Sequence, residues 1–249
     1  MDIICCLTSY PKRIKNCYRV IKSLVGNTML PTKVYLTLAR TEFPNGIDDL
    51  PPLLRKLVIT HPLVHLNWVD VNTKAMKQVI PVLQFLNDDD LILCCDDDIL
   101  YPSDYIESRV NEFNKFNLPI TGCVNQYGRT LFKWGIQTLV GYACAFQKKH
   151  ITNICGFINN DIMSASNSDG TYSMVCWLNG YAAHDVSKYD KDWLYEHCSF
   201  NEGDSSRTNK TCLYGDELLF VFRKRVCELT HMDIFDDVSS KFSFGFFRK

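Results

Sequence analysis

The sequence lacks the features that would mark a membrane-spanning or secreted protein. No run of 18 or more apolar residues occurs among its 249 residues, which excludes an apolar transmembrane helix of ordinary length. The first residues, Met1 to Ile4, carry neither the basic region nor the long apolar core of a signal peptide. We therefore expect a protein that works in the cytoplasm.

Charge and cysteine use argue against two further classes. The formal net charge is −1 and no long basic stripe appears, so nucleic acid is not an expected partner. Twelve cysteines are present, but no C-x-x-C spacing indicates a zinc site. Two adjacent pairs, Cys5-Cys6 and Cys94-Cys95, lie in apolar runs where cysteine acts as a small hydrophobic residue. We expect reduced thiols and no disulfide.

The composition, 46% hydrophobic and 22% charged, suits one globular domain over residues 1–249. Short apolar segments alternate with segments of helical spacing in its first hundred residues. The predicted strands are Ile3–Leu7, Lys33–Leu38, Val64–Val69 and Leu91–Cys95; the predicted helices are Cys17–Val25 with Asn16 as N-cap, Pro52–Val58 and Thr73–Leu86. Such alternation across short connections predicts an α/β fold with a mostly parallel central sheet flanked by helices.

The alternation stops after a further amphipathic helix. The remaining predicted elements are a helix at Ser103–Phe116, strands at Ile120–Val124 and Leu139–Phe146 with Phe132–Gly135 between them, a polar loop at Ile158–Tyr172, a helix at Glu217–Val226 and a short strand at Glu228–His231. We expect this half of the chain to be irregular. Long loops in compact domains often serve function, so the polar loop is a candidate binding segment.

The strand Leu91–Cys95 runs directly into three carboxylates, Asp96, Asp97 and Asp98. Adjacent carboxylates repel one another by roughly 4 kcal/mol per pair at ~4 Å and an effective dielectric of ~20. A divalent cation or a set of hydroxyl donors would relieve that repulsion. In open α/β sheets, ligands bind outside the carboxyl ends of the strands, where this triplet lies. The triplet Asp88–Asp90 precedes the strand instead, so we interpret it as a solvated turn.

The first strand carries Thr8, Ser9, Tyr10 and Arg13 at its own carboxyl end. In a doubly wound sheet the first and fourth strands are neighbours, so these side chains should face the carboxylates. The set suits a nucleotide sugar. Tyr10 can stack on a base, Arg13 can grip a phosphate or a base carbonyl, a carboxylate can take ribose hydroxyls, and a metal on Asp98 can neutralise a leaving diphosphate.

These two segments also carry a family resemblance. Thr8 to Arg13 reads T-S-Y-P-K-R, and Asp96 to Pro102 reads D-D-D-x-x-Y-P; Pro31–Leu36 and Glu42–Pro44 add to the pattern. Together they resemble the GT-A fold glycosyltransferases of bacterial polysaccharide clusters and large algal viruses. The closest likeness is to chlorovirus-type enzymes that glycosylate a capsid protein. It covers residues 3–147, and more weakly residues 213–231.

The resemblance implies roles for the matching positions. Thr8, Tyr10 and Arg13 would hold the nucleotide with Ser9 and Asp97 beside them, Asp96 would meet the ribose, and Asp98 would bind Mn²⁺ or Mg²⁺ as part of a DxD motif. Residues 1–117 would then form the donor half and residues 118–249 the acceptor half. A viral enzyme of this kind would work in the host cytoplasm.

Other positions carry open alternatives. Lys77 falls where the family often has a lysine near the donor, and is otherwise a solvated helix lysine. Asp216 and Glu217 match an acidic pair before an apolar helix, either of which would serve as catalytic base, or they are ordinary acids at a helix start. His231 would be a third metal ligand beside Asp96 and Asp98, or a buried histidine with satisfied hydrogen bonds.

The predicted function is metal-dependent transfer of a monosaccharide from a nucleotide diphosphate sugar, with a UDP-sugar favoured. The acceptor is a glycan hydroxyl, expected on a capsid protein, and inversion at the anomeric carbon is expected. Two alternatives belong to other classes. A sugar nucleotidyltransferase would usually show a glycine-rich loop after the first strand, but Thr8 to Arg13 contains no glycine. A catalytically inactive sugar-binding module would not need both acidic clusters.

Overall fold

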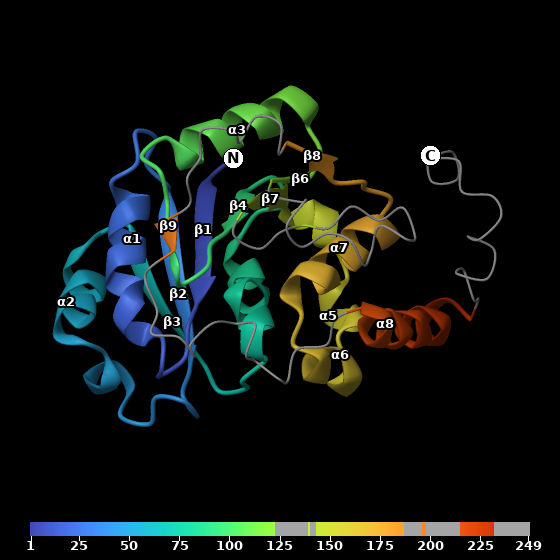
Figure 1. Ribbon diagram of the computed structural model, residues 1–249, viewed down its shortest axis with the longest axis horizontal. Helices are drawn as coiled ribbons and strands as arrows, with labels where there is room; N and C mark the ends of the chain where they lie inside the picture. The colour runs from blue at the N-terminus through green and yellow to red at the C-terminus, as the bar shows by residue number, and fades with distance from the viewer. Residues whose placement is uncertain (123–138, 140–142, 187–195, 198–214, 232–249) are drawn as a thin grey trace.

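The computed structural model describes residues 1–122, 139, 143–186, 196–197 and 215–231. Within them, seven strands form one sheet: β1 (Ile3–Thr8), β2 (Lys33–Ala39), β3 (Val64–Val69), β4 (Leu91–Cys94), β6 (Ile120–Thr121), β7 (Cys144–Gln147) and β8 (His184–Asp185). Their order is β3-β2-β1-β4-β7-β6-β8 (Figure 1). The first four run parallel, and β7 is antiparallel to both β4 and β6. The predicted α/β class with a mostly parallel sheet is confirmed.

Helices cover both faces of the sheet. One face carries α1 (Cys17–Val25), α2 (Pro52–Thr60) and α3 (Tyr105–Phe116), and the opposite face carries α5 (Ile154–Phe157), α6 (Asn160–Ala165), α7 (Ser168–Leu178) and α8 (Gly215–Thr230) (Figure 1). The alternation of strand side chains divides the core accordingly. In β1, for example, Cys5 and Leu7 pack under α1, whereas Ile4 and Cys6 pack toward α7.

The remaining elements are short. They are the 3₁₀ helices η1 (Ile14–Asn16), η2 (Gly46–Asp49), η3 (Lys74–Gln78), η4 (Ile80–Phe85) and η6 (Lys148–Ile151), and a separate antiparallel pair of strands, β5 (Ile99–Leu100) and β9 (Glu196–His197). Among the described residues, no helix combines the length and the apolar character that crossing a bilayer requires.

The first half of the chain follows the sequence prediction closely. The four predicted strands and the helices at residues 17, 52 and 103 all form, with ends that differ by at most two residues. Asn16 is the N-cap residue of α1 as predicted, but its side chain makes no capping hydrogen bond. The 3₁₀ turn η1 feeds the chain directly into α1 instead.

The predicted helix at Thr73–Leu86 is wrong. The segment forms two 3₁₀ helices, η3 and η4, joined at Val79. Pro81 explains the break, because its ring would clash with the carbonyl four residues earlier and it has no N–H to donate. A proline also disfavours α-helical geometry in the residue before it, here Ile80.

The predicted loop at Ile158–Tyr172 is wrong as well, since α6 and the first part of α7 occupy it. The asparagines that suggested a loop are helix caps. The side chain of Asn159 accepts the N–H of Ile162, and that of Asn167 accepts the N–H of Gly170. Asparagine is favoured at both N-caps and turns, so composition alone did not separate the two outcomes.

Three other predictions concern the second half. The predicted strand at Glu228–His231 is wrong, because α8 continues to Thr230 and Glu228 pairs with Arg225 on the helix surface. The strands predicted at 120–124 and 139–146 appear as the shorter β6 and β7, with part of each range outside the described residues. Residues 132–135 lie entirely outside the described part of the chain.

The triplet Asp88–Asp90 lies before β4, at the edge of the sheet opposite the Asp96–Asp98 triplet. Asp89 is exposed and pairs with Lys149 at 2.8 Å. Asp90 differs from the prediction of a solvated turn because it is buried and accepts the backbone N–H groups of Asp2 and Asn87. The nine cysteines in the described residues are free thiols, and the other three lie outside them.

Candidate functional site

Two loops meet at the carboxyl edge of the sheet. Strands β1 and β4 are parallel neighbours, with Cys6 opposite Cys94. The N–H of Cys95 donates to the carbonyl of Cys6 at 2.9 Å, so the two chains leave the sheet together. The loop Thr8–Arg13 follows one strand and the loop Asp96–Asp98 follows the other. The expected juxtaposition of these two loops is therefore present.

A buried ion cluster joins the loops. The guanidinium of Arg13 contacts the carboxylates of both Asp97 and Asp98, with an Nη2–Oδ2 distance of 2.6 Å to Asp98. The hydroxyl of Ser9 donates to the other oxygen of Asp97. All four residues are less than a tenth exposed. A guanidinium relieves the repulsion that the sequence predicted among these carboxylates.

The electrostatics of the triplet differ along its length. Burial raises the pKa of Asp97 to about 6, while the Arg13 guanidinium and the Ser9 hydroxyl oppose that rise. Burial also raises the pKa of Asp96 well above its usual range, and the nearby carboxylates of Asp98 and Asp169 raise it further. Clustered acids with perturbed pKa values in one place are typical of a functional site.

A buried glutamine ties the two strand ends together beneath the cluster. The side-chain amide of Gln78 donates to the carbonyl of Cys6 at 3.1 Å and to that of Cys95 at 2.8 Å. Gln78 belongs to η3, so the short helix that replaced the predicted long one sets the spacing of the two loops. No sequence pattern predicted this contact, because the contact depends on the break at Pro81.

Lys77 is not the solvated helix lysine of one alternative, since only 3% of it is exposed. Its ammonium group lies 3.2 Å from the carboxylate of Glu42 and 3.2 Å from the side-chain oxygen of Asn72. Burial lowers its pKa, whereas the charges of Glu42 and Asp97 raise it. Lys77 therefore lies within the electrostatic reach of the carboxylate cluster.

A small open pocket lies beside the loop that follows β1. Its volume is ≈ 240 Å³, and it is lined by Pro11, Ile14, Glu42, Phe43, Pro44 and Asp49. The pocket has one aromatic wall and two carboxylates, and Glu42 joins it to the buried ammonium group of Lys77. Such a pocket can take a flat polar ring such as a nucleobase.

Thr8 and Tyr10, two residues predicted to bind the donor, make hydrogen bonds that hold the loop Thr8–Arg13 in place. The hydroxyl of Thr8 donates to the carbonyl of Thr37 on β2 at 2.7 Å. The carbonyl of Tyr10 accepts the N–H groups of Arg13 and Ile14, which closes the turn and directs Arg13 toward the carboxylates. Thr8 and Tyr10 are half-buried at the mouth of the site.

Asp169 is a candidate that the sequence interpretation missed. It lies in the first turn of α7, where it is half-buried, and its charge raises the pKa of Asp96 more than that of Asp97 does. A signal was present in the sequence, because Asn167 two residues earlier is a favoured N-cap and an acid is favoured in the first helical turn. Because a loop was predicted at Ile158–Tyr172, the start of a helix at Asn167 was not recognised.

Of the two acids predicted in α8, the structure describes the side chain of Glu217 only. Glu217 is exposed in the first turn of α8, and the side chain of Asp216 lies outside the description. His231 follows the helix with φ of +57° and is exposed, so it is not the buried histidine of the alternative. The described residues contain no group of three His, Cys, Asp or Glu side chains that could hold a metal ion, so His231 does not join Asp96 and Asp98 there.

Comparison with solved structures places this fold among known ones. The chain aligns with TarS of S. aureus, residues 1–349, with a TM-score of 0.57 and 12% identity over 95% of this chain and 68% of that one. The complex of TarS 1–349 with UDP-GlcNAc gives a TM-score of 0.58 and 14% identity over 95% and 69% of the two chains. The complex with UDP gives 0.58 and 12% over 95% and 68%.

The arrangement of sheet and helices that the chain shares with TarS is of the GT-A type. No family model matches the chain, and no curated protein matches it in sequence. The comparison shows a shared fold. The chain spans 41% of the length of the longer TarS structure.

Proposed function

We propose that this protein transfers a monosaccharide from a nucleotide diphosphate sugar, most readily a UDP-sugar, to a hydroxyl group of a glycan. The observation that carries the proposal is the buried cluster of Ser9, Arg13 and the Asp96–Asp98 triplet at the carboxyl edge of the sheet. UDP-GlcNAc and UDP bind TarS, which has the same fold, and this supports a UDP-sugar as the donor.

The donor would lie across the two loops. Tyr10 and the pocket next to Pro11 would take the base, and Glu42, which lines that pocket, would be held in place by its ion pair with Lys77. Asp96 would accept the ribose hydroxyls, and Arg13 would hold the carboxylates in place and meet the diphosphate. Tyr10→Ala or Arg13→Ala would then raise the KM for the donor, since both contacts exist in the ground state too.

The carboxylates fit a divalent cation. Mg²⁺ is usually held by one or two carboxylates together with substrate phosphates, and Asp96 and Asp98 offer two. The remaining ligands would come from the donor and water, which is consistent with the lack of a three-residue group among the described residues. Mn²⁺ or Mg²⁺ bound there would supply positive charge for the leaving diphosphate.

Inversion requires a base on the acceptor side, within hydrogen-bond reach of the attacking hydroxyl. Asp169 is suited to that role, because α7 holds it at the edge of the carboxylate cluster without making it part of the triplet. Asp216 and Glu217 at the start of α8 remain the competing pair. The base would take the proton of the acceptor hydroxyl as the bond to the anomeric carbon forms and the nucleotide diphosphate leaves.

The acceptor follows from the sequence resemblance. The T-S-Y-P-K-R and D-D-D-x-x-Y-P segments resemble those of capsid-glycosylating enzymes, so a glycan on a viral capsid protein is the proposed acceptor.

A donor-hydrolysis screen tests the function. The protein is incubated with UDP-, GDP- and dTDP-sugars and Mn²⁺, and release of the nucleoside diphosphate is measured. We expect release from at least one UDP-sugar, and Asp98→Asn should abolish it, with a melting curve to check that the variant still folds. Asp89→Asn is the matched control, because Asp89 belongs to the other triplet and is exposed.

Two outcomes would contradict the proposal. Equal loss in Asp89→Asn and Asp98→Asn would mean that the cluster is not the site. Pyrophosphate release from a nucleoside triphosphate and a sugar phosphate, without donor hydrolysis, would identify a nucleotidyltransferase instead.

A further inference from the structure

One outer face of the molecule is strongly basic, although the whole chain has a net charge of −1. Residues 11–60 contain nine Lys and Arg but three Asp and Glu. The cations are spread between apolar residues, so the sequence shows no basic run. The fold brings four of them, Lys15, Arg19, Lys22 and Lys56, onto the outer surface of the layer formed by α1 and α2, whereas Arg13 is buried in the candidate site.

Three cations form a stripe along η1 and α1, with Lys15 in η1 and Arg19 and Lys22 in α1. Lys15, Arg19 and Lys22 are exposed and stand four and three residues apart, which places them on one side of the helical path. The buried residues Val20 and Leu24 point the opposite way, into the core. None of the three cations forms an ion pair within the part of the chain that the structure describes.

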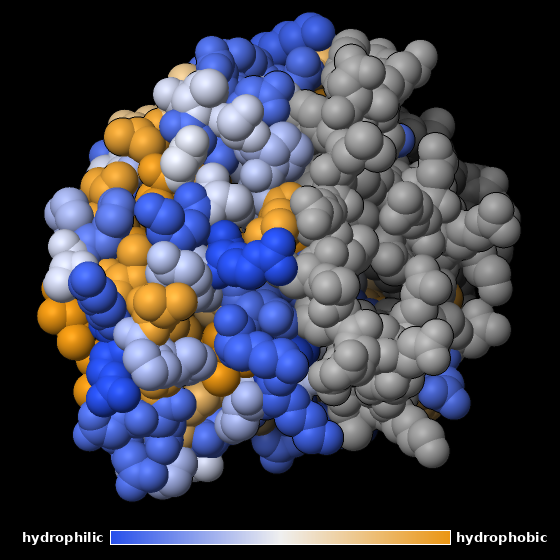
Figure 2. Space-filling model, turned by 60° about the vertical axis from the view of Figure 1, so that its left-hand side comes forward, coloured by the Kyte–Doolittle hydropathy of each residue, from blue (hydrophilic) through white to orange (hydrophobic). Residues whose placement is uncertain are grey.

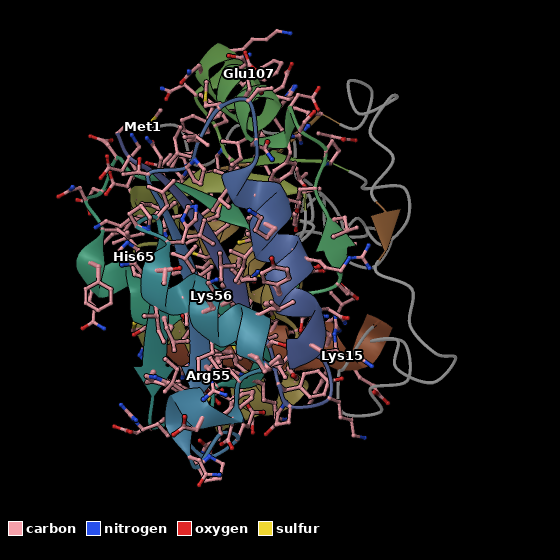
Figure 3. The ribbon with its side chains drawn as sticks, turned by 90° about the vertical axis from the view of Figure 1, so that its left-hand side faces the viewer. Met1, Lys15, Arg55, Lys56, His65 and Glu107 are labelled. Atoms are coloured by element: carbon pink, nitrogen blue, oxygen red, sulfur yellow. The ribbon has the colours of Figure 1, made fainter. Side chains whose placement is uncertain are left out.

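The neighbouring helix adds aliphatic side chains. In α2, Leu53 is 59% exposed and Ile59 is 65% exposed, with the exposed Lys56 midway between them. Helices α1 and α2 pack against each other on the same side of the sheet. Figure 3 looks onto this side, with Lys15 at one end of α1 and Lys56 on α2. Figure 2 shows hydrophobic and hydrophilic residues intermixed over the same side of the molecule.

Local acids do not neutralise these cations. Asp48 forms an ion pair with Arg55, with an Nη1–Oδ1 distance of 2.8 Å, and Asp49 accepts hydrogen bonds from Asn45. The acidic residues of the next helix, α3, begin at Glu107, whose carboxylate accepts the hydroxyl of Thr28. The surface that carries these cations and exposed aliphatic side chains therefore ends where α3 begins.

We propose that this face, formed by Lys15, Arg19, Lys22, Leu53, Lys56 and Ile59, docks the protein onto an anionic lipid membrane. Cations attract anionic headgroups, and exposed aliphatic side chains enter the boundary between headgroups and acyl chains. The exposed large hydrophobic residues of α1 and α2 are aliphatic, whereas single-stranded nucleic acid is usually met by stacking aromatic rings. The combination favours a membrane over a soluble polyanion.

Docking would hold the candidate site close to the membrane surface. The loop Thr8–Arg13 leads through η1 directly into α1, so the cluster and the basic stripe belong to consecutive segments. The inference does not depend on the proposed function, because it concerns binding alone and is tested without donor or acceptor.

Vesicle sedimentation tests the proposal on the full chain. The protein is spun with sucrose-loaded vesicles of phosphatidylcholine alone, or of phosphatidylcholine with phosphatidylserine at 7:3, in 0.1 M NaCl. We expect binding to the mixed vesicles and not to the neutral ones. The variant Lys15→Gln/Arg19→Gln/Lys22→Gln should bind about a hundredfold more weakly, at roughly fivefold for each of the three cations lost. Leu53→Ser/Ile59→Ser should bind severalfold more weakly.

The matched control is Lys148→Gln/Lys149→Gln/Lys224→Gln, which removes the same charge from η6 and α8 and should keep wild-type binding. Melting curves check that each variant folds, and the substituted α1 cations are solvent-exposed. Failure of the wild type to bind mixed vesicles would overturn the proposal. So would equal weakening in both triple variants, no effect of Leu53→Ser/Ile59→Ser, or release from vesicles by equimolar single-stranded RNA.

Discussion

At the residue scale, Arg13 is the charge that allows three carboxylates to lie together. Its guanidinium contacts Asp97 and Asp98 in a buried place, where removing one partner leaves an uncompensated charge. A buried pair is broken at a cost of about 3–5 kcal/mol, whereas an exposed pair is usually worth under about 1 kcal/mol. The role of Arg13 thus extends from donor binding to the stability of the site.

We therefore predict that Arg13→Gln lowers the free energy of unfolding by about 3 kcal/mol. Adding Asp97→Asn should recover part of that loss, because the double variant buries one negative charge fewer. Urea denaturation of the four proteins in this double-mutant cycle measures the coupling. The control cycle uses the exposed pair Arg55 and Asp48, and similar coupling energies in both cycles would contradict the prediction.

The second prediction at this scale concerns the base. Asp169→Asn should lower kcat by about 10²–10⁴, the usual contribution of general base catalysis, while leaving donor affinity within a factor of two. Single-turnover assays and UDP titration separate the two effects. Asp216→Asn and Glu217→Gln are the comparison. A loss confined to either of them would move the base to α8, and the role of Asp169 would be refuted.

At the scale of elements, the first turn of α7 sets the position of Asp169, the proposed acceptor-side acid. Asn167 caps the helix through the N–H of Gly170, and its backbone carbonyl accepts the hydroxyl of Thr171. Gly170 lets α8 come close, since an added Cβ would lie 3.1 Å from Phe222 and 3.2 Å from Leu218. The cap and the glycine together fix the first turn of α7, which carries Asp169.

A pair of cap variants tests this arrangement. Asn167→Ala and Asn159→Ala each remove one N-cap and should each cost about 1 kcal/mol of stability. Only Asn167→Ala should also lower kcat, because only α7 holds Asp169. Thermal melts and initial rates measured side by side give both quantities. A similar fall of kcat in Asn159→Ala would show that the effect comes from lost stability alone.

At the scale of the whole molecule, His150 links stability to pH. It is buried in η6, where its Nδ1 accepts the N–H of Gln147 and its ring packs on Phe113 and Tyr181. Burial and, to a smaller extent, the charge of Lys149 lower its pKa to about 4, against the opposing charge of Asp89. The unfolded state, with a pKa near 6.5, therefore takes up the proton first.

It follows that His150 makes the protein less stable as the pH falls from about 6.5 to 4. The slope approaches 1.4 kcal/mol per pH unit, and the total is about 2–3 kcal/mol. Asp97 acts in the opposite direction, because its folded pKa of about 6 lies above its unfolded value, so its protonation favours the folded state in that range. Because His150 and Asp97 change the stability in opposite directions, the pH dependence of the wild type alone does not reveal the contribution of His150.

The difference in unfolding free energy between the wild type and His150→Asn isolates the contribution of His150 to the pH dependence. Asparagine can still accept the N–H of Gln147 but does not titrate, so the stability advantage of the wild type should shrink by about 2 kcal/mol between pH 7 and pH 4.5. Urea denaturation across that range gives the difference at each pH. An advantage that stays constant would mean that His150 remains neutral in both states.

The sequence by itself determined the parallel half of the sheet and the two loops of the site. Apolar runs of fixed length specify β1 to β4, and parallel pairing brings the residues after β1 and β4 to one edge. Local patterns of that kind act over a few residues, so they can be recognised without knowing what packs against them. The predicted α/β class depended on such patterns. The placement of Arg13 opposite the carboxylates also needed the strand order of a doubly wound sheet, and the GT-A type came from the family resemblance.

Only the tertiary structure decided the rest. The contact of Gln78 with both strand ends and the approach of Asp169 to Asp96 join residues more than fifteen positions apart. The basic face needs α1 and α2 to lie side by side, although no basic run exists in the chain. Charge and hydrogen bonding act through space, so side chains that are unremarkable in sequence become a site or a surface only where packing brings them together.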